Sequence, residues 1–231
     1  MLRYCINLLF LLAFTVSYTQ GIGSEQKDTI YLNKYGLRVG IDLYNPIHTA
    51  VDNNRKGLEI VGDYRISKKL FAATELGYLE NTTDEDFMNF TTNGSYIKLG
   101  VDYNAYENWL DMENMIYVGF RYGFSVFNHT LNSYIINNDA FYDDLTSPKN
   151  GQNFNNLNAH WGEIILGVKA EVLTNLYMGF SFSGKKMISS KQPNNFKNLF
   201  VPGFNRVFLN NSGFGFNYTI SYLIPFYKKE K

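Results

Sequence analysis

The chain has 231 residues, of which only 18% are charged, and its 21 basic side chains equal its 21 acidic ones in number. With no excess of either sign, it has no basic surface to recruit nucleic acid and no acidic tail, so nucleic acid is excluded as a partner. Aromatic residues reach 17%, yet the only long apolar run lies at the extreme N-terminus, which argues against a helical membrane protein.

Residues 1–19 are predicted to be a secretory signal peptide. Arg3 precedes an apolar run from Ile6 to Val16, which is too short to cross a bilayer as a helix, and small polar residues follow up to a cleavage site before Gln20. Cys5 leaves with the signal, so the mature chain is expected to have no cysteine. Disulfides, thiol catalysis and cysteine-based metal sites are therefore excluded.

Eight later segments alternate apolar and polar residues with a period of two, which is typical of strands with two chemically different faces. In the first, Leu37, Val39 and Ile41 alternate with Arg38 and Asp42. No charge falls on the apolar face of any segment. The predicted strands cover residues 35–44, 58–66, 70–78, 97–104, 116–125, 161–172, 176–185 and 214–224.

Two folds produce this alternation. A soluble sandwich or lipocalin-like barrel would turn the apolar face inward, whereas an outer-membrane barrel turns it toward lipid. Three features favour the membrane: Tyr and Phe near the strand ends of the apolar face, a polar face rich in Gly with nearly balanced charge, and connections that alternate in length. The predicted fold is all-β, a transmembrane antiparallel up-and-down β-barrel of eight strands.

The connections also predict orientation. Outer-membrane barrels keep short turns in the periplasm and long loops outside, and an even number of strands returns both termini to the periplasm. The second, fourth and sixth connections are short or modest, whereas the others are longer, around residues 45–56, 80–94, 128–158 and 186–205. The predicted organisation is a signal peptide (1–19), a periplasmic N-terminal segment (20–34), the barrel (35–227) and a C-terminal tail (228–231).

The polar face predicts a filled interior. Eight strands enclose a space just wide enough for side chains, and a buried lone charge costs several kcal/mol. We therefore expect an interdigitated network of ion pairs, with Gly residues making room for Arg and Lys. An ion or proton path is the functional interpretation, and a polar core is the simpler one that we favour. The network residues are Arg38, Asp42, Glu59, Asp63, Arg65, Glu75, Lys98, Asp102, Arg121, Glu163, Lys169, Glu171 and Lys185.

Several segments resemble a family of outer-membrane β-barrels of unknown function in Gram-negative bacteria. The resemblance covers roughly residues 35–227 and implies an outer-membrane barrel without any catalytic residue to transfer. Family members look like companions of larger outer-membrane machines. The segments are GSYIKLGVDYN (94–104), YVGFRYGFS (117–125), NAHWGEIILGVKAEVLTNLYMGFS (158–181), VPGFN (201–205) and GFNYTISYLIPF (215–226).

Few residues suggest chemistry. His129 shares a predicted loop with Asp139, Asp143 and Asp144, and another loop carries acids at 84–86, but irregular spacing makes solvated loop acids the better explanation than a metal site. No metal and no cofactor are expected.

A lipid-modifying barrel enzyme would place a His and a Ser or Tyr on the outer rim, as His160 beside Ser125 could. No local sequence signature of a catalytic triad accompanies this pair. The chain is therefore expected not to be an enzyme.

Two predicted loops contain more apolar residues than an exposed loop usually does, and such residues need a cover, either one another or a partner protein. The leading hypothesis is a non-enzymatic structural or accessory subunit of an outer-membrane complex, which docks a larger outer-membrane protein or a surface lipoprotein. The alternatives are a small-solute pore or transporter and a lipid-modifying enzyme. The candidate partner-binding residues are Tyr134, Ile135, Ile136, Phe141, Tyr142, Phe154, Phe196, Leu199, Phe200 and Phe204.

Overall fold

The computed structural model describes residues 32–52, 54–85, 88–108, 112–136, 145–146, 151–193 and 197–230. The predicted signal peptide and most of the predicted N-terminal segment lie outside the described residues. Within the described ranges, no helix has the length and apolar character needed to cross a membrane.

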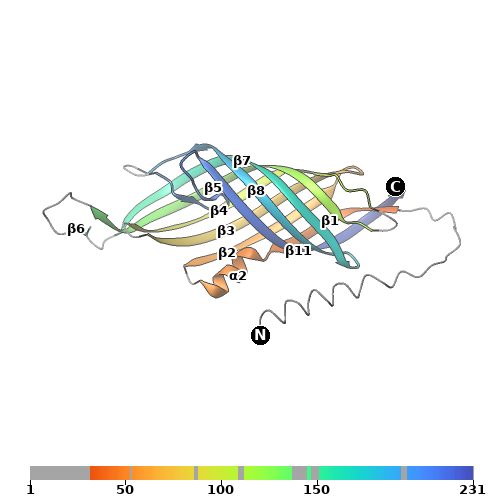
Figure 1. Ribbon diagram of the computed structural model, residues 1–231, viewed down its shortest axis with the longest axis horizontal. Helices are drawn as coiled ribbons and strands as arrows, with labels where there is room; N and C mark the ends of the chain where they lie inside the picture. Colours follow the sequence, from red (N-terminus) through yellow and green to blue (C-terminus); the bar gives the residue numbers. More distant parts are fainter. Residues whose placement is uncertain are drawn as a thin grey trace, which may run out of the picture. The chain divides into compact units, whose positions relative to one another are not determined.

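Eight long antiparallel strands form a closed ring (Figure 1). Consecutive long strands pair with one another, and the ring closes because the first strand pairs with the last. The prediction of an all-β, up-and-down, eight-stranded barrel is confirmed. The strands are β1 (Leu32–Asp42), β2 (Arg55–Arg65), β3 (Leu70–Glu85), β4 (Met88–Asn104), β5 (Met115–Ile136), β7 (Gln152–Leu173), β8 (Leu176–Ser190) and β11 (Ser212–Glu230).

Four short elements lie between the long strands at one end of the barrel, which we call the long-link end. They are α2 (Tyr44–Val51), β6 (Leu145–Thr146), β9 (Phe200–Val201) and β10 (Asn205–Arg206). At the other end, the short-link end, β2 and β3 are joined through residues 66–69 and β7 and β8 through residues 174–175.

The strands run beyond the segments that alternation predicts. Residues 80–94, predicted as a long loop, are mostly the end of the β3–β4 hairpin, in which the hydroxyl groups of Thr82 and Thr91 lie 2.9 Å apart. The alternation fails there because the outer face is polar and the inner face mixes polar residues with Met88 and Phe90, so the pattern ends before the strand does. The barrel also exceeds its predicted bounds of 35–227, since Leu32 pairs with Glu230.

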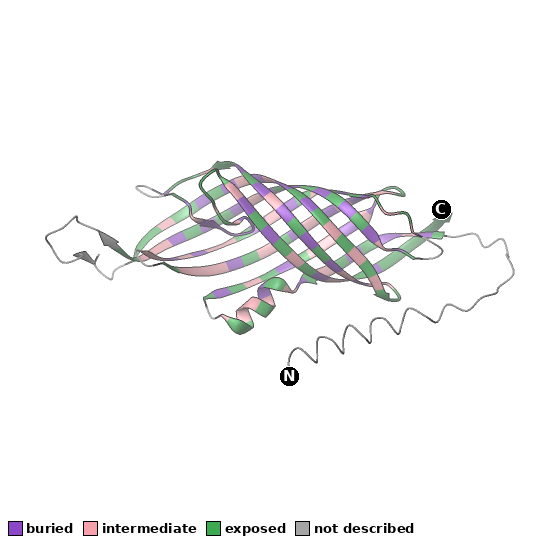
Figure 2. Ribbon diagram, in the orientation of Figure 1, coloured by how far each residue is buried: buried purple, intermediate pink, exposed green. Residues whose placement is uncertain are grey.

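The two faces of the wall have the chemistry expected of an inverted barrel, as the alternating buried and exposed residues in Figure 2 show. Inward-facing Arg121 and Asp102 are 3% and 0% exposed, whereas outward-facing Phe120 and Leu166 are 55% and 57% exposed. The soluble arrangement, with charges outside an apolar centre, is therefore wrong for the described residues.

Aromatic rings occupy the space beside several inward-facing glycines. A Cβ atom on Gly123 would lie 2.2 Å from the Trp161 ring, and one on Gly77 would lie 2.3 Å from the Tyr96 ring. Each glycine is paired with that aromatic residue on the neighbouring strand. At these two positions glycine makes room for an aromatic ring, and not for the Arg and Lys side chains that we predicted.

Candidate functional site

Lys98 lies at the centre of the charged interior. It projects inward from β4, is 2% exposed, and its Nζ lies 2.7 Å from Glu75, 3.3 Å from Glu59 and 4.0 Å from Glu163. The hydroxyl group of Tyr96 donates to Glu59 over 2.6 Å. Three buried carboxylates thus share Lys98, and their burial would be costly without nearby cations.

Arg121 extends this cluster across the neighbouring strands. Its Nε lies 3.2 Å from Glu75, and its Nη1 and Nη2 donate to the two oxygens of Asp102 over 2.7 and 3.0 Å. This two-pronged geometry fits a guanidinium to a carboxylate and is among the stronger charged contacts. Glu75 therefore joins Lys98 and Arg121 into one network.

A second group of ion pairs lies toward the short-link end. Asp63 is 3.1 Å from Arg38 Nε and 2.6 Å from Lys169 Nζ. Arg65 pairs with Glu113, which lies just before β5. Lys185 Nζ lies 3.5 Å from Glu163 in the first group, so each carboxylate of the two groups lies within 4.0 Å of a basic side chain.

All thirteen residues predicted for the interior network face inward. Eleven are buried, and Lys169 and Glu171 are partly buried. Asp42 forms no ion pair with a described residue, and its carboxylate accepts hydrogen bonds from the backbone N–H groups of Tyr44 and Tyr218.

The prediction missed two partners, Lys34 and Glu113, because they lie just outside the alternating segments. Lys34 pairs with Glu171 over 2.9 Å, and Glu113 pairs with Arg65. Lys34 directly precedes the first predicted segment, so extending that segment by one residue would have included it.

Little space remains inside the barrel. Two interior cavities measure about 30 Å³, beside Asp63 and Arg121, and about 10 Å³, beside Arg38 and Arg65. One water molecule needs roughly 10–15 Å³ of such cavity volume, so each of these cavities has room for one or two waters. Ionic and aromatic side chains therefore occupy most of the described interior beside these two cavities.

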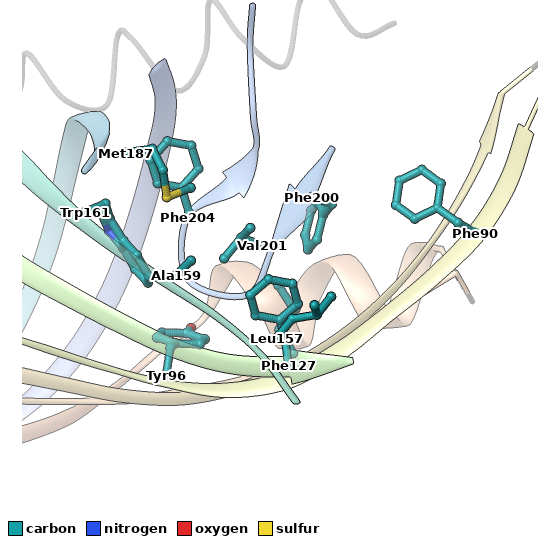
Figure 3. Packing of buried hydrophobic residues seen from close by; sticks show 11 residues of the cluster. Phe90, Tyr96, Phe127, Leu157, Ala159, Trp161, Met187, Phe200, Val201 and Phe204 are labelled. Carbon is teal, nitrogen blue, oxygen red and sulfur yellow. The ribbon is translucent and has the colours of Figure 1, made fainter. Parts of the chain in front are cut away.

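A segment after β8 closes the long-link end from inside. We call residues 197–207, which include β9 and β10, the plug. Phe200, Val201 and Phe204 are 6%, 0% and 0% exposed. Figure 3 shows them among inward side chains of the wall, where Phe204 meets Trp161 edge to face with ring centroids 5.8 Å apart. The plug thus buries apolar surface and fills the lumen at the same time.

Polar contacts from three strands hold the plug in place. Lys185 Nζ donates to the backbone oxygen of Gly203 over 2.7 Å, and Arg55 donates to Asn205 over 3.1 Å. His129 Nε2 lies 3.1 Å from Asn198 Oδ1. The plug is therefore tied to the charged interior as well as to the apolar cluster.

The plug corrects part of the predicted partner surface. Phe200 and Phe204 are wrong as partner-binding residues, because both fold into the barrel, where burial removes them from water. Leu199 and Phe154 are partly buried against the same cluster, and Tyr134 is 38% exposed. The remaining candidates, whose side chains lie outside the described residues, are Ile135, Ile136, Phe141, Tyr142 and Phe196.

The predicted His160–Ser125 pair is also wrong. His160 is paired with Phe124 and therefore shares the outer face with it, whereas Ser125 faces inward and is 0% exposed. His160 Nδ1 lies 2.7 Å from the hydroxyl oxygen of Tyr122, on the outer face. The two predicted residues stand on opposite sides of the wall.

The loop residues considered for metal binding do not converge in the part of the structure that is described. His129 Nδ1 contacts the hydroxyl group of Thr92, while Asp139, Asp143 and Asp144 lie outside the described residues. Among the described residues, no three His, Cys, Asp or Glu side chains are grouped so as to hold a metal ion.

A cavity of about 770 Å³, which we call the mouth cavity, lies at the long-link end between the plug and the ends of β3 and β4. Its apolar lining includes Met88, Phe90, Leu199, Phe200, Phe208 and Leu209. Its charged lining residues are Glu85, Lys197 and Arg206, of which Glu85 and Arg206 are 3.4 Å apart. The mouth cavity is much larger than the interior cavities.

Comparison with known families identifies the chain. A family model described as Domain of unknown function (DUF6048) matches residues 1–229. The chain belongs to the DUF6048 family. The match includes seven complete barrel strands and nearly all of β11, so the DUF6048 region contains both the charged interior and the plug.

Two further comparisons accompany the DUF6048 match. A search of curated proteins found no match. Among solved structures, the crystal structure of Neisserial surface protein A is similar to this DUF6048 chain over 83% of the chain and 97% of the neisserial one. The TM-score is 0.42 and the sequence identity is 12%.

Proposed function

We propose that this DUF6048 protein is an integral outer-membrane barrel that neither conducts nor catalyses, and that it acts as a structural or accessory subunit of an outer-membrane complex. The observation that carries the proposal is the filled interior: ion pairs occupy the middle and the plug closes one end. A barrel without a lumen acts through its outer wall or its ends.

The outer wall supports the membrane placement. Every long strand presents exposed apolar side chains, and an apolar band that surrounds a barrel is far larger than the patches that monomeric soluble proteins expose. The predicted signal peptide is consistent with export. One such residue from each long strand is Val39, Ile60, Leu76, Leu99, Phe120, Leu166, Phe180 and Phe216.

Leu166→Arg should destabilise the barrel in lipid. Leu166 lies midway along β7 on the outer face, and a charge at the midplane of a bilayer costs about 2–4 kcal/mol. Urea unfolding in lipid vesicles, followed by the electrophoretic shift of the folded barrel, measures this loss. Leu209→Arg, at a fully exposed residue beyond the wall, is the control and should have little effect. Equal stability of the two variants in lipid would contradict the membrane placement.

The folded protein should show no steady channel conductance in planar bilayers. The ion pairs and the plug leave no continuous path, so added protein should produce no ohmic current steps at voltages that the bilayer withstands. A trimeric general porin, added to the same bilayer afterwards, should give its usual steps and shows that the assay works. Reproducible steps from well-folded protein would favour the pore alternative.

The partner surface is narrower than the sequence predicts. With Phe200 and Phe204 inside the barrel, the described apolar residues left at the long-link end include Ile47 and Val51 on α2, which are 56% and 86% exposed, and Leu209. We infer that a larger outer-membrane protein or a surface lipoprotein docks on this end.

Purification in mild detergent at native abundance tests the accessory role. A stoichiometric companion should be lost from the Ile47→Asp/Val51→Asp variant and retained by Lys68→Asp, which alters an exposed residue at the short-link end. Recovery of the wild-type protein as a lone monomer would overturn the accessory role.

A further inference from the structure

The C-terminal quarter of the chain carries charge of one sign. No Asp or Glu occurs between Glu171 and Glu230, whereas that stretch contains seven Lys and Arg residues. Four of them are exposed at the long-link end: Lys186, Lys191, Lys197 and Arg206. Neither the ionic interior nor the proposed docking role accounts for these four cations.

Two of the four cations line the mouth cavity, and the other two lie close to its lining residues in the chain or through a hydrogen bond. Lys197 and Arg206 line it directly. Lys191 lies between two lining residues, Ser190 and Gln192, and its Nζ donates to the backbone oxygen of Asn156 on β7. Lys186 donates to the backbone oxygen of Asn210, next to two further lining residues. A basic rim thus borders a space of about 770 Å³, which is within the usual size of ligand pockets.

The inside of the mouth cavity is apolar. Met88 and Phe90 line it from β4, and Leu199, Phe200 and Phe208 line it from the plug and the residues that follow. Glu85 is the one described acid in its lining, and it pairs with Arg206 over 3.4 Å. Both partners are at least half exposed, so this ion pair is weak and leaves the rim open to another anion.

Two neighbouring strands, β1 and β2, end earlier at the long-link end than the strands on either side of them. β2 begins at Arg55, which pairs with Asn81, whereas β3 continues beyond Asn81 to Glu85. On the other side, Asp42 of β1 pairs with Thr219, yet β11 begins seven residues earlier, at Ser212. The described residues between β3 and β11 at this end belong to α2 and its connections, so the strands of the barrel are shortest on this side.

We propose that the mouth cavity binds an anionic lipid with a phosphate head group. The acyl chain lies against Phe90, Leu199 and Phe208, and the phosphate is held by Lys197 and Arg206, with Lys186 and Lys191 nearby. An apolar cavity with a basic rim fits an amphiphile of this charge better than a polar solute. The inference rests on the membrane placement proposed above and goes beyond the accessory role, because it assigns a ligand to this end of the barrel.

Native mass spectrometry of the detergent-solubilised barrel with myristoyl lysophosphatidic acid tests the proposal. We expect one retained lysolipid per barrel. Lys197→Gln/Arg206→Gln should bind it about tenfold more weakly, since each lost cation removes a charge-assisted contact. Lys228→Gln/Lys229→Gln removes two cations from the same acid-free stretch at the other end of β11 and should bind like the wild type. Ser190→Trp, which narrows the mouth cavity and keeps its cations, should also weaken binding.

Two other probes identify what is recognised. Myristoyl lysophosphatidylcholine, with the same chain and no net charge, should bind weakly, and inorganic phosphate should not compete at the concentrations used. Equal binding of the zwitterionic lysolipid, competition by phosphate alone, or equal loss in both double variants would overturn the proposal. The stability of Leu166→Arg in lipid is measured separately, so a failure of lipid binding remains distinguishable from a failure of the membrane placement.

Discussion

Replacing Lys98 by Met should lower the free energy of unfolding by about 3–5 kcal/mol, because it removes one partner of a buried ionic cluster. Met nearly matches the length of the Lys side chain, so the loss reports the missing charge more than a cavity. Glu75, Glu59 and Glu163 would then lie in the barrel without the cation that they share. Urea unfolding in lipid vesicles, monitored by electrophoretic mobility, measures the change.

Two further variants separate charge from packing. Lys98→Met/Glu75→Gln removes one carboxylate together with the cation and should recover part of the loss, since fewer charges remain uncompensated. Lys69 forms an exposed ion pair with Glu107, and the hydrogen bond to Glu107 raises the pKa of Lys69. Because exposed ion pairs contribute little, Lys69→Met should leave the free energy of unfolding nearly unchanged. Similar losses in Lys98→Met and Lys69→Met would show that the interior is too hydrated for the ion pairs to matter.

Gly203→Val should release the plug from the barrel. Gly203 has a φ angle of 82°, where a β-branched residue is strained, and a Cβ atom there would lie 2.6 Å from the Tyr96 ring. Val201→Cys provides a reporter, because Val201 is 0% exposed and the mature chain is predicted to have no other cysteine. Maleimide labelling of this cysteine in the folded barrel should become at least about tenfold faster in Gly203→Val, which corresponds to a cost of about 1.4 kcal/mol or more.

Gly184→Val is the matched control for the plug. Gly184 lies on β8, and a Cβ atom there would meet no atom within 4 Å, so the added side chain should not alter labelling. Slow labelling in both variants, in protein that remains folded, would mean that the plug tolerates the substitution and is held less tightly than its burial implies.

Releasing the plug also separates two barriers to conduction. The ion pairs around Lys98 and Arg121 lie below the plug and do not depend on it for their partners. Gly203→Val alone should therefore leave the barrel non-conducting in planar bilayers. Current steps from this variant, together with silence of the wild type, would identify the plug as a gate and revive the pore alternative.

The mouth cavity and the plug lie where sequence patterns say least. Residues 186–205 have no two-residue alternation. Their apolar residues are equally compatible with a loop that covers the end of the barrel and with a surface that binds a partner protein. Phe204 enters the barrel because the wall leaves an apolar space beside Trp161 there, and that space exists only after β7 and β8 pair. No local property of the plug sequence specifies this space.

The sequence by itself determined where most of the strands lie and which of their side chains face the interior of the barrel. A two-residue period places each charge of a segment on one side, so Arg38, Asp63 and Lys98 had to face inward once the ring closed with apolar residues outside. Only the tertiary structure decided which charges pair, because Lys98 meets Glu59, Glu75 and Glu163 across three other strands whose alignment depends on register and curvature. It likewise decided that the plug folds inward, because filling the lumen and burying Phe200 and Phe204 occur together.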